Sequence, residues 1–226
     1  MFYIDIYYII LIVPTIVLSL IAQVKVSSTF NKYSTVLNAK GLTGAQVARK
    51  ILDANGLTHV VVKPTRGNLT DNYNPMDKTV NLSESVYNST SVAALGVAAH
   101  ESGHAVQHAT SYGPLSARTA IFPVVRISSA AAIPLAMLGF ILGFKPLVSI
   151  GIILFAAVVL FHVITLPVEF NASRRAIHVL ENDGILTAEE NEGAKKVLSA
   201  AAMTYLASAL TAIANLIRLI LISRED

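Results

Sequence analysis

Four long apolar runs divide the chain, and segments of mixed character separate them. At a helical rise of 1.5 Å per residue, runs of this length reach roughly the 30 Å of a bilayer's hydrocarbon core. Residues 6–24, 127–144 and 146–166 are each predicted to span a membrane, and the Gly-Phe-Lys-Pro turn makes the second and third a hairpin. The last run, 197–217, is rich in Ala, Ser and Thr, which suits a span or close packing against other helices. We favour a fourth span.

Between the first two runs, hydrophobic residues recur with the short periods of amphipathic helices and strands. Residues 42–57 have the amphipathic period of a helix, and residues 58–64 are predicted as a strand that its proline ends. Residues 66–77 are polar and contain Gly, Asn, Asp and Pro, so they are predicted as a loop. Residues 78–84 alternate as a half-exposed strand would, and Ser89 or Thr90 is expected to cap the helix that follows.

Composition fixes the broad class. Hydrophobic residues make up 54% of the chain and charged residues 14%, which predicts an integral membrane protein. The chain has no cysteine, so a tightly bound metal must rely on histidine and carboxylate ligands. The net charge of +3 comes without a basic cluster interleaved with aromatic residues, so we exclude nucleic acid as a partner.

Basic residues predict the orientation. They follow the first apolar run as Lys25, Lys32, Lys40, Arg49 and Lys50. Because cytoplasmic segments carry an excess of lysine and arginine, the segment after the first span is predicted to face the cytoplasm. Arg174 and Arg175 follow the third run, so that exit is predicted to face the same side.

The candidate chemistry lies in the segment His100-Glu101-Ser102-Gly103-His104. Residues i and i+4 share one face of a helix, so both imidazoles of this HExxH pattern can reach one Zn²⁺ at about 2.0–2.1 Å. Glu101 could then take a proton from the attacking water. The alternative is a set of polar residues that caps a buried helix. We favour zinc, because unpaired polar groups would be costly in such apolar surroundings.

A catalytic zinc site needs a third protein ligand. On a continuous helix His108 lies about 12 Å along the axis from His100, too far to share the ion, so it is expected to orient another group or to lie at the surface. Glu169 follows the third apolar run, on the side predicted for His100 and His104, although it could instead pair with Arg174 or Arg175. Ser173 lies one helical turn after Glu169 and could orient a ligand.

These residues resemble the YugP-type family of putative neutral zinc metallopeptidases of bacterial membranes. The resemblance covers nearly the whole chain and includes the HExxH segment, the hairpin, and the segments at 41–57, 69–75, 78–87, 168–176 and 200–210. It implies a gluzincin-like site in which His100, His104 and Glu169 bind zinc and Glu101 is the base. Related gluzincins carry aspartate where this chain has Ser173, and Asn171 stands where many relatives have an acidic residue.

The sequence thus predicts a predominantly α-helical membrane protein with a small zincin-like α+β metallopeptidase domain. We divide it into an anchor at 1–24, a cytoplasmic zincin-like part at 25–118, a transmembrane hairpin at 119–166, and a segment at 167–226 with the third-ligand helix and the C-terminal helix. The expected activity is zinc-dependent hydrolysis of peptides or proteins in the bacterial plasma membrane. The alternatives are a site-2-type intramembrane protease and a zinc-binding scaffold without proteolytic activity.

Two features of the candidate site are not assigned by the sequence. Strand 78–84 precedes the HExxH helix, where zinc proteases commonly hold an extended substrate against an edge strand, but an ordinary structural strand is equally consistent with the pattern. The oxyanion donor is unassigned, with four tyrosines as candidates: Tyr73, Tyr87, Tyr112 and Tyr205.

Overall fold

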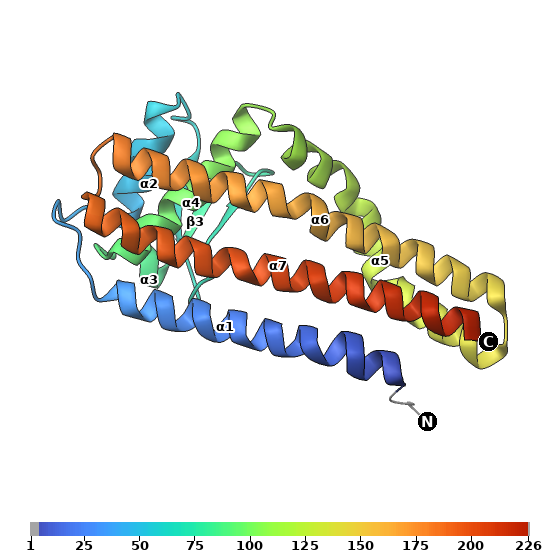
Figure 1. Cartoon of the computed structure of the whole chain (residues 1–226). Coiled ribbons are helices and arrows are strands. Elements are labelled where there is room, and N and C mark those ends of the chain that lie inside the picture. Colours follow the sequence, from blue (N-terminus) through green and yellow to red (C-terminus); the bar gives the residue numbers. More distant parts are fainter. Residues whose placement is uncertain (1–4, 226) are drawn as a thin grey trace. The chain divides into compact units, whose positions relative to one another are not determined.

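The computed structural model describes residues 5–225, most of which are helical (Figure 1). The elements in chain order are a π-helical turn at Tyr8–Ile12, α1 (Val13–Ser34), α2 (Gly44–Ala54), β1 (Val61–Thr65), β2 (Asn72–Asn74), β3 (Thr79–Ser83), α3 (Glu84–Tyr87), α4 (Val92–Ala109), α5 (Gly113–Leu142), α6 (Lys145–Asn182) and α7 (Ala188–Glu225).

The described residues form two compact units that do not follow the order of the sequence. The helical unit comprises the described parts of Met1–Gln23, Pro114–Pro167 and Met203–Asp226. The mixed unit comprises Val24–Gly113 and Val168–Ala202. The segment 167–226 therefore contributes to both units.

Within residues 5–225, four helical segments are long and apolar enough to cross a membrane: Tyr8–Ser34, Gly113–Leu142, Lys145–Asn182 and Ala188–Glu225. The last of these includes the fourth apolar run. Within the helical unit, α5 and α6 are joined by a short turn in which Gly143 has a φ of +62°, a conformation that favours glycine. These helices also approach closely, because a Cβ at Gly151 of α6 would lie 2.8 Å from the Ala132 carbonyl oxygen of α5.

The sheet of the mixed unit corrects three sequence predictions. Its order is β1-β3-β2, with β1 parallel and β2 antiparallel to β3. Residues 66–77 are not all loop, because they contain β2. Pro64 does not end β1 but lies inside it, which an edge strand tolerates because proline lacks an N–H donor. β3 is central and mostly buried, so it is neither half-exposed nor an edge available to an extended substrate.

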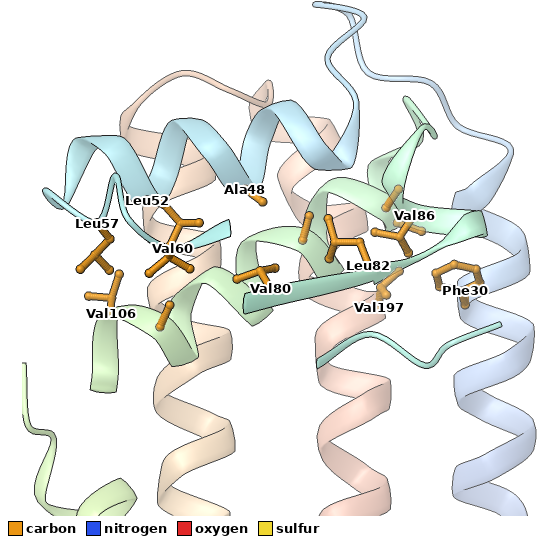
Figure 2. Packing of buried hydrophobic residues seen from close by; sticks show 14 residues of the cluster. Phe30, Ala48, Leu52, Leu57, Val60, Val80, Leu82, Val86, Val106 and Val197 are labelled. Carbon is orange, nitrogen blue, oxygen red and sulfur yellow. The ribbon is translucent and has the colours of Figure 1, made fainter. Parts of the chain in front are cut away.

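A hydrophobic core lies between α2, β3 and α4, as Figure 2 shows for Leu52, Val80 and Leu82. The α2 helix begins with a capping box between Thr43 and Gln46. Capping and core burial together hold α2 and the sheet against α4. Helix α4 is thereby fixed within the mixed unit.

Side-chain caps also begin α4 and α7. Ser91, rather than Ser89 or Thr90, caps α4, because its side-chain oxygen accepts a hydrogen bond from the Ala94 backbone N–H. A capping box also begins α7, in which Thr187 N–H donates to the Glu190 side chain and Glu190 N–H donates to the Thr187 side chain. Each cap satisfies donors that the first helical turn leaves free.

Candidate metal centre

Helix α4 carries three of the candidate residues on a largely buried surface. It is rich in alanine and glycine, and their small side chains let neighbouring elements pack closely against it. Glu101 and His104 are buried, and the side chain of His100 is 11% exposed. The spacing of His100 and His104 on one helix brings their rings to a centroid separation of 4.7 Å, nearly perpendicular to each other. The two imidazoles therefore form a preformed pair.

Helix α6 supplies the carboxylate. Val168 and Ala172 are fully buried on the face where α6 lies closest to α4, and Glu169 and Ser173 follow each of them by one residue. The close approach depends on Gly103, because a Cβ at this position would lie 3.1 Å from the Ala172 carbonyl oxygen. The glycine within the HExxH pattern thus lets the two helices pack with Glu169 beside the histidines.

The three side chains converge on one point. The Glu169 Oε2 atom lies 3.3 Å from His100 Nε2 and 3.5 Å from His104 Nε2. Among the described residues 5–225, this is the group of ligating side chains close enough to share a metal ion, with its ligand atoms all within 4.8 Å of one another. Ligands about 2.0–2.2 Å from a tetrahedral zinc ion lie about 3.3–3.6 Å apart. Both the donor types and the separations from Glu169 fit such an ion.

The remaining ring nitrogens have other partners. Ser173 Oγ lies 3.1 Å from His100 Nδ1, so the hydroxyl is placed to orient this ring. Gln107 Oε1 lies 2.9 Å from His104 Nδ1. Both Nδ1 atoms are thus engaged on the outside of the cluster, and both Nε2 atoms face Glu169. Histidines that bind metals commonly have this arrangement.

Burial also sets the electrostatics of the cluster. It raises the pKa of the Glu101 carboxyl, and the nearby His100 and His104 oppose this only in part. Burial alone would lower the pKa of His104, but the hydrogen bond to Glu169 and the charges of Glu101 and Glu169 outweigh it and raise this pKa. The two buried carboxylates therefore favour positive charge at the histidines, which a divalent cation can supply.

His108 lies outside the cluster. Its Nδ1 atom is 2.8 Å from the hydroxyl of Tyr73, which belongs to β2, and its side chain is exposed. The same contact engages Tyr73, one of the four tyrosines considered as oxyanion donors. His108 and Tyr73 thus connect α4 to the sheet.

Gln107, which contacts His104, was not predicted from the sequence. This residue is fully buried, and it follows His104 by three positions, a spacing that places two residues on the same helical face. That spacing was the available signal, but a glutamine near the end of an apolar helix resembles a surface residue until its burial is known.

The packing of Gly103 gives a first testable prediction. Replacing Gly103 by valine should lower the free energy of unfolding by about 1–3 kcal/mol, because the added atoms must displace the Ala172 backbone. Zinc affinity should fall as well, since Glu169 moves with α6. Thermal unfolding and metal competition measure the two effects. Gly113→Val is the matched control, because no heavy atom lies within 4 Å of a Cβ at Gly113. Equal stability and zinc affinity in both variants would contradict this account of the helix contact.

Comparisons with known proteins agree with the chemistry of this cluster. A family model described as "Putative neutral zinc metallopeptidase" matches residues 8–224. A relative from Bacillus subtilis (strain 168), named "Putative membrane protease YugP", is 50% identical over 215 residues, which cover 95% of this chain and 96% of the relative. No solved structure matches the chain. Because the family model and the relative each span nearly its whole length, the chain belongs to the family of putative neutral zinc metallopeptidases.

Proposed function

We propose that this protein is a membrane-embedded, zinc-dependent endopeptidase whose metal ligands are His100, His104 and Glu169. The observation that carries the proposal is the approach of both Nε2 atoms to one carboxylate oxygen, at 3.3 and 3.5 Å. Ser173 and Gln107 engage the opposite ring nitrogens, which supports metal binding through Nε2. Two imidazoles and one carboxylate leave a fourth position for water or substrate.

Bound zinc would polarise the scissile carbonyl and make water a stronger nucleophile. Glu101 would accept the proton that the attacking water loses and pass it to the amine of the leaving peptide. Burial raises the pKa of its carboxyl, which makes the protonated acid easier to form after this transfer. The buried surroundings of α4 limit the access of bulk water, which strengthens the electrostatic interactions within the site.

Metal removal and restoration test the proposed activity. The purified protein is incubated with a fluorescently labelled, unfolded polypeptide before chelation, after chelation, and after zinc is added back. Cleavage should be present in the first sample, absent in the second and restored in the third. Cleavage that continues at the same rate in the chelated, metal-free protein would contradict the proposal.

We further propose that the chain crosses the bacterial plasma membrane several times and that the candidate site faces the cytoplasm. The name of the relative and the apolar helices support the membrane location, and the basic residues after the first span support the orientation.

Cysteine labelling tests this orientation, because the chain has no cysteine of its own. Lys50→Cys should react with a membrane-impermeant maleimide only after cells are opened, whereas Lys145→Cys, at the first residue of α6, should react in intact cells. Both positions are exposed, so access to the reagent depends on the side of the membrane. The reverse labelling pattern would overturn the orientation.

A further inference from the structure

Gln107 is fully buried and makes three hydrogen bonds, two that connect α4 to α6 and one to His104 within α4. Its Nε2 atom donates to the Val168 carbonyl oxygen and to Asn171 Oδ1, each at 2.9 Å. Its Oε1 atom lies 2.9 Å from His104 Nδ1. Both N–H groups of the amide thereby donate hydrogen bonds to α6, and the amide oxygen faces the imidazole of His104.

The neighbouring groups determine which end of the amide faces His104. A backbone carbonyl can only accept hydrogen bonds, so the group that faces Val168 must be the NH₂ of Gln107. Arg175 Nε donates to Asn171 Oδ1 at 2.8 Å, and a guanidinium has no acceptor. Asn171 must therefore present its oxygen to both Arg175 and Gln107. Two independent contacts thus require the same orientation of the Gln107 amide.

This orientation fixes the proton on His104. Because Gln107 Oε1 can only accept, a neutral His104 must carry its hydrogen on Nδ1. Its free lone pair then lies on Nε2, the atom that faces Glu169. From this geometry we infer that Gln107 is a positioning residue, oriented by Val168, Asn171 and Arg175, which holds His104 in the tautomer and ring orientation that metal binding requires. This inference rests on the proposed function.

A neutral amide suits this position because of the charge already present. Glu101 and Glu169 are both buried, and a carboxylate in place of the amide would add a third negative charge. It would also face the Val168 carbonyl oxygen, which cannot donate a hydrogen bond to it. The amide orients the imidazole without either cost.

The test compares Gln107→Met, which removes the acceptor, with Gln107→Glu, which keeps an acceptor for His104 Nδ1 but loses the donors to α6. Zinc affinity is measured by competition with a chelator of known affinity, and stability by thermal unfolding of the metal-free protein. Gln107→Met should bind zinc on the order of 10–100-fold more weakly than wild type. Gln107→Glu should recover most of this affinity, although its metal-free form should be no more stable than that of Gln107→Met.

The matched control is Asn191→Leu. Asn191 is another buried amide, and its Nδ2 atom donates to the Ile177 carbonyl oxygen of α6 and to Glu181, away from the histidines. This variant should lose stability but keep its zinc affinity.

The outcomes separate this inference from the proposed function. If Gln107→Met binds zinc as tightly as wild type, the positioning role is wrong and the zinc site stands. Equal weakening in Gln107→Met, Gln107→Glu and Asn191→Leu would show that zinc affinity only follows stability, which also overturns the role. If wild-type protein binds no zinc, the proposed function itself fails, and the inference fails with it.

Discussion

Replacing Glu101 by glutamine should abolish peptide hydrolysis while zinc stays bound. The amide has nearly the same shape as the carboxylate but cannot accept the proton of the attacking water. Because general base catalysis typically contributes about 10²–10⁴-fold to a rate, peptidase activity should fall by at least about 100-fold. Glu101 lies in the buried part of α4 but is not among the residues that converge as ligands, so zinc content should match that of wild type. Cleavage assays and elemental analysis of the same preparation measure both quantities.

Glu192→Gln is the control for this substitution. Glu192 lies on α7 with an exposed side chain that pairs with Lys195, so its loss should change neither activity nor zinc content. Substantial cleavage by Glu101→Gln protein would show that another group is the base. If instead the variant loses cleavage but cells that depend on the protein are unaffected, the cellular function is that of a zinc-binding scaffold.

Replacing Glu169 by alanine should remove zinc. The substitution leaves two imidazoles on α4 and takes away the group that both Nε2 atoms face. Substituting groups that only orient metal ligands typically costs 10–100-fold in affinity, so loss of a ligand should weaken zinc binding by more than about 100-fold. Zinc per chain after purification, together with a chelator competition, measures the effect. Peptidase activity should be lost in parallel.

Glu181→Ala is the control on the same helix. Glu181 accepts a hydrogen bond from Asn191 and lies outside the histidine cluster, so zinc binding should persist. If Glu169→Ala protein retains zinc at wild-type affinity, the third ligand is a different group. His108 would then be the next residue to replace, although its ring contacts the Tyr73 hydroxyl and lies outside the cluster.

The candidate ligands on α4 could be predicted because a helical period fixes their relation. Residues four apart share one face, so the sequence alone places His100 beside His104. Glu169 was harder to predict as a ligand, because it is distant in sequence from His100 and His104 and its position depends on how α6 packs against α4. Predicted membrane topology and the family resemblance indicated its side of the membrane. The contact itself depends on Gly103, whose close approach to Ala172 no local pattern reveals.

Strands were predicted less well than helices, for physical reasons. β2 consists of Asn-Tyr-Asn, and asparagine is uncommon in strands, so only the pairing with β3 makes this segment extended. Pro64 indicated the end of a strand, but its place on an edge removes the usual penalty. The alternation in 78–84 predicted one exposed face, whereas β3 is the central strand and is covered by its neighbours. In each case tertiary context decides the outcome.

The groups around the ligands were predicted only in part. Ser173 was predicted to orient a ligand from its spacing with Glu169, and its hydroxyl lies within hydrogen-bond distance of His100. The link from Gln107 through Asn171 to Arg175 joins two helices, so its parts could not be connected from sequence alone.

X-ray absorption at the zinc edge of the zinc-loaded wild-type protein tests the central claim most directly. The spectrum should show one zinc environment with two imidazole ligands and oxygen ligands, all at about 2.0–2.2 Å. In Glu169→Ala protein that environment should be missing or replaced by a more weakly bound and more hydrated ion. A wild-type site with three or more imidazoles, or one that is unchanged by Glu169→Ala, would contradict the assignment of His100, His104 and Glu169 as the zinc ligands.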